Sequence, residues 1–157
     1  MKLSELLDSN AIVPELQSST RDGVLSELVQ ALVTTGCFEP QNAEPVLKAL
    51  ADREAQGSTG FGKGVAVPHC QHAAVGSMVL AVGRSTKGVD FNALDKAPVY
   101  SVFLLLSPPD DQDRHLQAME LIFRPLQRAT FRKWLRQADT PKAIMDCIVQ
   151  AEDAGVD

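Results

Sequence analysis

The sequence predicts an α/β fold in which a small mixed β-sheet is flanked by helices. Apolar residues recur at helical spacing between residues 20 and 57, and again after residue 110. Between these regions, residues 65–106 contain three apolar runs that are typical of strands. Helices, then strands with loops, then helices again fit a small sheet covered by helices. The 157 residues correspond to one domain of roughly 100–200 residues, and no repeat or linker divides them.

The first two helices are predicted between residues 20 and 57. One begins at Thr20 and stops at Gly36, and the second begins near Pro40 and ends at Gly57. Arg53 then lies in the last turn of the second helix, close to the segment that follows. The apolar residues that share a face in these helices are Val24, Leu25, Leu28, Val29 and Leu32, and then Ala43, Val46, Leu47 and Leu50.

The middle of the chain predicts the sheet. Residues 57–64 read GSTGFGKG and are too rich in glycine to form a regular element. The β-branched run 65–67 stops at Pro68 and is predicted to be a short strand. Residues 77–85 and 99–106 are apolar enough to be strands buried inside a sheet.

Three helices are predicted to complete the chain. Three aspartates between residues 110 and 113 favour a helix N-terminus, where carboxylates complement the dipole. Pro125 should kink or break this helix. The next helix surrounds Trp134, and the last begins at Thr140-Pro141, an N-cap followed by proline at the first helical position. The core is expected to include Leu47, Leu50, Leu104, Leu105, Met119, Ile122, Phe123 and Trp134.

Composition excludes several classes of protein. A formal net charge of −5 and a pI of about 5.2 argue against a domain-wide grip on nucleic acid, which requires an excess of Lys and Arg. Three cysteines are too few for a disulfide scaffold. Glu5, Asp8 and Asn10 interrupt any apolar core of a signal peptide, and no stretch approaches the roughly 18 apolar residues of a membrane span. We therefore expect a cytoplasmic protein that does not insert into a membrane.

The glycine-rich segment resembles a nucleotide-binding P-loop in part. It contains Gly57, Gly62 and Lys63 at the required spacing, but Gly64 stands where Ser or Thr would hold Mg²⁺. The predicted context is also reversed, because the loop follows a helix and enters a strand, so no helix N-terminus is present to hold phosphates. Gly60, Gly62 and Gly64 occupy alternate positions, and they allow the backbone to adopt positive φ or to approach a ligand closely. The segment is therefore not expected to bind ATP or GTP, and a plain flexible connector stays open as the alternative to a ligand-binding loop.

His69 is the most informative histidine. It follows Pro68, so it should project from the end of a strand beside the glycine-rich loop. A single histidine is more often structural than catalytic, but Ser58 and Thr59 offer hydroxyls, glycines expose peptide N–H groups, and Arg53 can bind an oxyanion through two bonds. This collection suits an anionic tetrahedral group arriving at an imidazole.

Two other chemistries compete for the same segment. His69, Cys70 and His72 are potential metal ligands to which His115 could add a fourth, but their spacing matches no common zinc site. Cys70 could act as a nucleophile beside a histidine. Adjacent residues of an extended segment point to opposite sides, however, which would separate Cys70 from His69. We therefore expect no metal site.

Residues 53–69, REAQGSTGFGKGVAVPH, closely resemble the signature of the fructose/mannitol-type EIIA domains of the bacterial phosphoenolpyruvate-dependent phosphotransferase system. This family includes the nitrogen-regulatory EIIA proteins. The resemblance continues through GVDFNALD at 88–95 with Pro98-Val99, LLLSP at 104–108 with His115-Leu116, and residues 131–135. It covers essentially the whole chain, and it implies one EIIA type-2 domain over residues 1–157 with a small mixed sheet flanked by helices.

The resemblance implies a phosphocarrier. Such domains accept a phosphoryl group on the histidine of the Pro-His pair from the phosphocarrier protein HPr or a paralogue. They pass it to a cysteine of an EIIB domain during sugar uptake, or use their phosphorylation state to switch binding to transporters or other partner proteins. By position, His69 would be phosphorylated, and Arg53 and His115 would be its active-site partners. The phosphoryl group is expected to be bound also by Ser58, Thr59 and Gly60.

This chemistry sets requirements on His69. Its ring must be neutral, with one nitrogen free and the other donating to an acceptor such as a backbone carbonyl. Neither Mg²⁺ nor another cofactor is expected, because donor and acceptor are both protein side chains. Simpler roles stay open: Arg53 can pair with Glu54 or Asp52 on its own helix, and His115 can cap its helix beside Asp111.

The chain departs from the family pattern at two positions. Cys70 replaces the glycine that usually follows the active histidine, and it would be strained by about 1–2 kcal/mol if that position required positive φ. His72 is an additional imidazole. Either residue could alter recognition of EIIB or add redox sensitivity.

Overall fold

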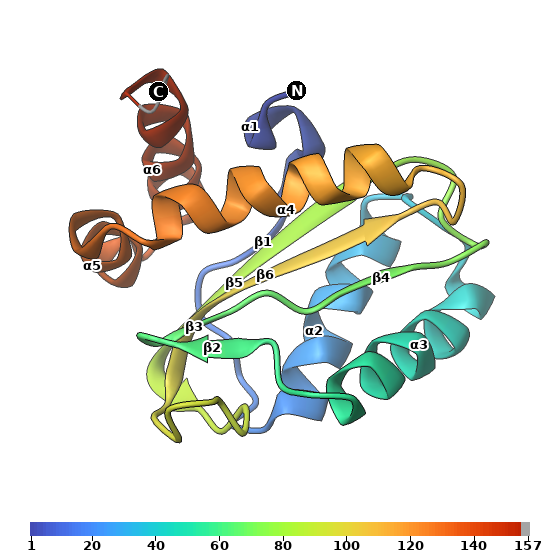
Figure 1. Ribbon diagram of the computed structural model, residues 1–157, viewed down its shortest axis with the longest axis horizontal. Helices are drawn as coiled ribbons and strands as arrows, with labels where there is room; N and C mark the ends of the chain where they lie inside the picture. The colour runs from blue at the N-terminus through green and yellow to red at the C-terminus, as the bar shows by residue number, and fades with distance from the viewer. Residues whose placement is uncertain (155–157) are drawn as a thin grey trace.

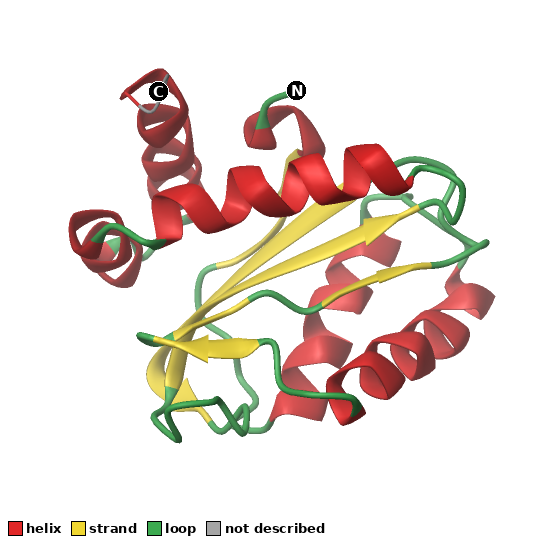
Figure 2. Ribbon diagram, in the orientation of Figure 1, coloured by secondary structure: helices red, strands yellow, loops and turns green. Residues whose placement is uncertain are grey.

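The computed structural model describes residues 1–154, and it shows a mixed sheet of six strands with helices on both of its faces (Figures 1 and 2). The strands are β1 (Leu7–Val13), β2 (Gly60–Gly62), β3 (Val65–Ala66), β4 (His69–Gln71), β5 (Val79–Val89) and β6 (Val99–Ser107). The helices are α1 (Leu3–Leu6), α2 (Arg21–Thr34), the 3-10 helix η1 (Pro40–Asn42), α3 (Ala43–Ala55), α4 (Gln112–Leu126), α5 (Ala129–Gln137) and α6 (Pro141–Ala154). Among the described residues, no helix has the length and apolar character needed to cross a bilayer.

Strand β6 organises the sheet. It pairs antiparallel with β5, and β1 runs parallel to β5 on the far side. Strands β3 and β4 both pair parallel with β6, one after the other along its length. They are separated by Pro68, which has no N–H to donate but whose carbonyl accepts the Leu105 N–H at 3.0 Å. The second segment therefore starts at His69, opposite Leu105 and near the carboxyl end of β6.

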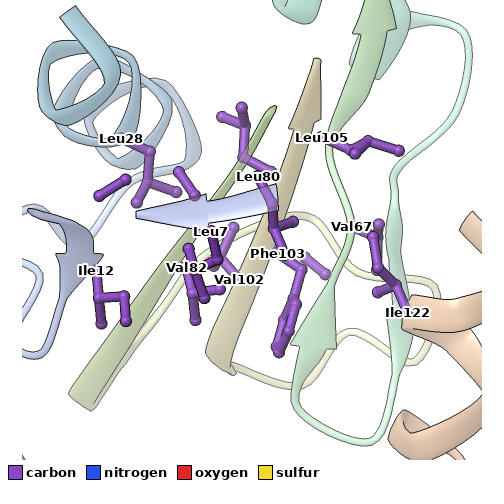
Figure 3. Close-up of a cluster of buried hydrophobic side chains, with 14 of the residues drawn as sticks. Leu7, Ile12, Leu28, Val67, Leu80, Val82, Val102, Phe103, Leu105 and Ile122 are labelled. Carbon is purple, nitrogen blue, oxygen red and sulfur yellow. The ribbon is translucent and has the colours of Figure 1, made fainter. Parts of the chain in front are cut away.

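The core lies on both faces of the central strands (Figure 3). Every residue of β6 except Tyr100 is buried, as expected for a strand covered on both sides. Helix α2 packs against β1 and β5, and α4 packs against β6. Leu28 of α2 and Ile122 of α4 are both fully buried. The prediction of a small mixed sheet flanked by helices is confirmed.

Helix ends follow the sequence signals. The Thr20 hydroxyl accepts the Gly23 N–H at 3.2 Å, and the Thr140 hydroxyl accepts the Ala143 N–H at 3.0 Å, so both predicted N-caps form. Gly36 ends the first long helix with φ +82°. Pro125 lies in the last turn of α4, which ends one residue later.

Several expectations are wrong. No strand was expected at β1. Its middle residues Asp8, Ser9 and Asn10 are all polar and exposed, so apolar and polar residues do not alternate along the strand, and only residues toward its two ends are buried. Strand β2 forms inside the glycine-rich segment, where a Cβ on Gly60 would lie 2.9 Å from that of Ala93, so the missing side chain permits close packing. Trp134 was expected in the core but is 46% exposed.

Candidate functional site

The fold brings His69 and His115 together. Their ring centroids lie 5.6 Å apart, with the ring planes tilted by 51°. One ring comes from the first residue of β4 and the other from the first turns of α4, which follows β6 after a short loop. His69 pairs with Leu105, near the carboxyl end of β6, and α4 follows that same end, so both histidines lie at the edge of the sheet where α/β proteins commonly bind ligands.

The ring of His69 is held in one tautomer. Its Nδ1 lies 2.8 Å from the carbonyl oxygen of Val67. A carbonyl can only accept, so Nδ1 carries the hydrogen and Nε2 carries the lone pair. Within residues 1–154, Nε2 has no hydrogen-bond partner, and it is not a fully buried atom. The expected arrangement, one nitrogen fixed on a backbone carbonyl and the other free, is therefore present.

Burial lowers the pKa of His69 below its ordinary value of 6.5. The bond to Val67 opposes this effect, while the positive charge of Arg53 lowers the pKa further and the negative charge of Glu54 raises it slightly. The half-buried ring is consequently neutral at pH 7, which leaves the Nε2 lone pair available as a nucleophile.

His115 is more buried and is oriented by Ser107. His115 is 7% exposed, and its Nδ1 forms a short hydrogen bond with the hydroxyl of Ser107, which is fully buried at the end of β6. Burial lowers the pKa of His115, and the neighbouring His69 lowers it further. The side chain does not cap α4, because only the backbone N–H of His115 bonds to Asp111, through its carbonyl oxygen.

Arg53 is held beside the glycine-rich loop by one hydrogen bond. Its Nη1 donates to the carbonyl oxygen of Gly57 at 2.9 Å, and this bond fixes the guanidinium beside the loop. Within the described chain it forms no ion pair with Glu54 or Asp52, and Asp52 instead pairs with Lys48 at 2.9 Å. The remaining N–H groups of the guanidinium are available to a ligand.

Hydrogen bonds within the protein hold the loop that follows α3 in one shape. Glu54, only 3% exposed, accepts both the backbone N–H of Thr59, at 3.1 Å, and its hydroxyl. The Ser58 hydroxyl donates to the carbonyl oxygen of Phe91 and accepts the Gly60 N–H, both at 3.0 Å. The donors expected at Ser58, Thr59 and Gly60 are thus engaged inside the protein in this state, where they fix the shape of the loop.

Sequence reasoning missed Glu54 and Ser107 as parts of this site. The signal for Glu54 is a carboxylate directly after Arg53 in a position that α3 buries. The signal for Ser107 is a polar residue that ends a buried apolar strand, immediately before Pro108. Both signals are weak without the fold, because surface carboxylates and serines are common in similar sequence contexts.

The alternative chemistries receive no support from the geometry. Burial raises the pKa of Cys70 to about 12, so its thiol is a poor nucleophile at pH 7. Cys70 has no positive φ, so the strain considered above does not arise. His72 accepts the Ala74 N–H at 3.0 Å and shapes a turn. In the part of the chain that is described, no three His, Cys, Asp or Glu side chains gather as metal ligands.

Comparison with known proteins identifies the family. Residues 5–151 match the family model described as "Phosphoenolpyruvate-dependent sugar phosphotransferase system, EIIA 2". The chain is 35% identical over 150 residues to the PTS system fructose-specific EIIABC component of Bacillus subtilis, covering 96% of this chain but only 23% of that protein. It is 31% identical over 153 residues to the nitrogen regulatory protein of Pseudomonas aeruginosa, covering 98% of each.

A solved structure agrees with these matches. The crystal structure of nitrogen regulatory protein IIA-Ntr from Neisseria meningitidis superposes with a TM-score of 0.83 at 27% identity, covering 92% of this chain and 97% of that one. Sequence and fold lead to the same family over nearly the whole length of the chain. The chain therefore belongs to the EIIA-2 family and is a phosphotransfer component of the phosphoenolpyruvate-dependent phosphotransferase system.

Proposed function

We propose that Nε2 of His69 accepts a phosphoryl group from the phosphohistidine of an HPr-like carrier protein and passes it to a cysteine of an EIIB domain. The observation that carries this proposal is the fixed tautomer: Nδ1 donates to Val67 at 2.8 Å, and Nε2 is left with an open lone pair. The lowered pKa of His69 supports the same role, because a protonated ring could not attack phosphorus.

In the transfer step, the Nε2 lone pair forms a bond to phosphorus as the bond between phosphorus and the donor nitrogen breaks. The electron pair of the broken bond returns to the donor ring. The His69 ring becomes positively charged as it is phosphorylated, and the Val67 carbonyl stabilises that charge through the Nδ1–H group. Transfer of this kind is catalysed mainly by positioning and by stabilising the charge on the phosphoryl oxygens.

Two side chains are assigned to those oxygens. Arg53 supplies guanidinium N–H groups that the bond to Gly57 leaves free. We assign the Ser107 hydroxyl as the donor in its hydrogen bond with Nδ1 of His115, which places the ring hydrogen on Nε2, where His115 can donate it to a phosphoryl oxygen. The two histidines then hold opposite tautomers, one suited to attack and the other suited to donate.

The proposal is tested by incubating the protein with phosphoenolpyruvate, enzyme I and HPr, and measuring its mass. We expect a gain of one acid-labile, base-stable phosphoryl group that disappears in His69→Ala. His72→Ala is the matched control, because it removes a nearby imidazole whose ring only shapes a turn. Unlabelled EIIB domain should then remove the group from the wild-type protein. Labelling that survives His69→Ala would refute the assignment.

A second function, regulation of partner proteins, is suggested by the relatives. The chain is 31% identical to the nitrogen regulatory protein of Pseudomonas aeruginosa, and a nitrogen regulatory protein is also its structural neighbour. Phosphorylation would add about −1.5 to −2 units of charge beside Arg53, enough to change which surfaces bind there. The test captures binding partners with wild-type protein and with His69→Ala, each with and without phosphorylation. A regulator changes its partners on phosphorylation and transfers no phosphoryl group to EIIB, whereas a phosphocarrier for sugar uptake transfers it.

A further inference from the structure

A positively charged hollow lies away from the histidines, between helix α5 and the turn that joins β2 to β3. Its volume is about 470 Å³, and its lining includes Lys63 from the turn and Arg132, Lys133 and Arg136 from α5. Figure 1 shows α5 beyond the end of α4 that is remote from His115. Eleven residues separate His115 from the end of α4, a rise of about 16 Å, so this hollow is separate from the His69 site.

The charge of the hollow is unusual for this protein. The chain carries 20 acidic and 15 basic residues, yet α5 contains no Asp or Glu. Among residues 1–154, none of the four cations of the hollow forms an ion pair with a carboxylate. Like charges three and four positions apart on a helix repel one another, so these cations destabilise α5, and a bound anion would remove that repulsion.

Both walls of the hollow are held in place by Tyr100. The guanidinium carbon of Arg136 lies 3.7 Å from the centroid of the Tyr100 ring. On the other side, a Cβ on Gly64 would lie 3.2 Å from the same ring, so the turn packs directly against it. The turn has positive φ at Lys63 and at Gly64, which fixes its course. The two walls are therefore linked by one side chain rather than facing each other by chance.

The arginines are oriented by further contacts. Arg132 donates through Nη1 to the Leu126 carbonyl at 2.8 Å, and Arg84 donates to the Arg136 carbonyl at 2.8 Å, which ties the end of α5 to β5. Interaction with the negative end of the helix dipole explains a cation at Arg136. It does not explain Lys133 or Lys63, which make no side-chain hydrogen bond or ion pair within the described chain and are both exposed.

We propose that this hollow binds a small molecule through a diphosphate group. Trp134, the exposed aromatic residue of α5, is not part of the lining, so the four cations lack the aromatic side chain with which proteins commonly anchor at a membrane interface. The volume falls in the range of about 300–1,000 Å³ that is usual for small-molecule sites. Guanidinium groups bind phosphate oxygens in pairs, and four cations match the charge of two adjoining phosphates better than that of one.

The test measures binding of inorganic pyrophosphate and ADP to the full chain by calorimetry in magnesium-free buffer. We expect one site, with orthophosphate binding at least about tenfold more weakly because it offers fewer charge-assisted bonds. Pyrophosphate should also raise the melting temperature, since it relieves repulsion along α5. ADP binding more tightly than pyrophosphate would identify a nucleotide ester as the ligand; the reverse order would identify the free anion.

The variant Lys63→Gln/Lys133→Gln removes one cation from each wall. The variant Lys87→Gln/Lys96→Gln is its matched control: all four lysines are exposed, and Lys63 and Lys96 share a φ near +60° (61° and 62°). We expect the first pair to weaken pyrophosphate binding at least about tenfold and the control less than about twofold.

The proposal is overturned if neither diphosphate binds to the wild-type protein, if both double variants lose the same affinity, or if orthophosphate and pyrophosphate bind with equal affinity. Binding only to vesicles that contain phosphatidylglycerol would likewise replace the small-molecule site with a membrane surface. The unfolding transition of each variant without ligand is measured first, and both should melt close to wild type because none of the four side chains is buried.

Discussion

The assignment of opposite tautomers to His69 and His115 depends on Ser107, and Ser107→Ala tests it directly. The Ser107 side chain is fully buried, and its hydroxyl bonds to Nδ1 of His115. Alanine removes the donor without adding bulk, and the buried position gives water no ready access to replace it. The His115 ring then loses the contact that places its hydrogen on Nε2.

The size of the effect follows from the kind of bond that is lost. A hydrogen bond between neutral groups contributes about 0.5–1.5 kcal/mol net, and an unsatisfied buried partner costs about 1–3 kcal/mol. We therefore expect the free energy of unfolding to fall by about 1–3 kcal/mol. If the bond is what selects the donor tautomer, its loss lowers the rate of phosphoryl transfer to His69 about two- to twelvefold.

Two measurements separate structure from mechanism. Nitrogen-15 NMR of the His115 ring reports its tautomer, and single-turnover transfer from phosphorylated HPr reports the rate. Ser101→Ala is the control, because Ser101 is also buried in β6, at 3% exposure, and its hydroxyl contacts neither histidine. Ser107→Thr keeps a hydroxyl and should restore the Nε2–H tautomer. If Ser107→Ala loses stability while the ring spectrum and the transfer rate stay unchanged, the tautomer argument fails.

Three further predictions follow from the site. Arg53→Lys should slow transfer in the same single-turnover assay by at least about tenfold, because an ammonium cannot reproduce the bidentate fork, whereas a rate within about twofold of wild type would mean that charge alone suffices. Glu54→Gln should lower the free energy of unfolding in urea by about 1.5–3 kcal/mol, since one charge-assisted bond to Thr59 is lost; an unchanged midpoint would contradict this. The free energy of unfolding should also fall on acidification, because the pKa values of His69 and His115 are lowered from 6.5 in the folded protein. Below pH 6.5 the unfolded chain therefore binds more protons than the folded protein, and the stability present above pH 6.5 is lost as the pH drops toward the folded-state pKa values. His69→Gln should flatten that dependence, and an equally steep one in the variant would exclude His69 as its source.

Much of the helical structure could be predicted because its signals are local. Thr20, Gly36 and Thr140 act as caps and stops through contacts within a few residues, so the sequence alone places these ends. The apolar run 102–106 of β6 likewise requires burial on both faces. Strand β1 escaped detection because an edge strand shows its polar residues to solvent, and only pairing with β5 makes it regular.

Trp134 shows the limit of apolar patterning. It lies on the same helix as Phe131 and Leu135, which are buried, but its position on α5 turns it outward. A spacing of three or four residues defines a face of a helix, whereas the arrangement of neighbouring elements decides how wide the buried part of that face is. The width is a tertiary property.

The sequence by itself determined the family, the ends of several helices after Thr20 and the candidate residues His69, Arg53 and His115, because those rest on residue type and short-range spacing. Only the tertiary structure decided that the His115 ring lies 5.6 Å from the His69 ring and contacts Ser107. Contacts of this kind depend on where the strands end and on how far a helix lies from them, and no local pattern encodes those distances. The chain specifies which groups are available, and packing sets which nitrogen of each ring is free to react.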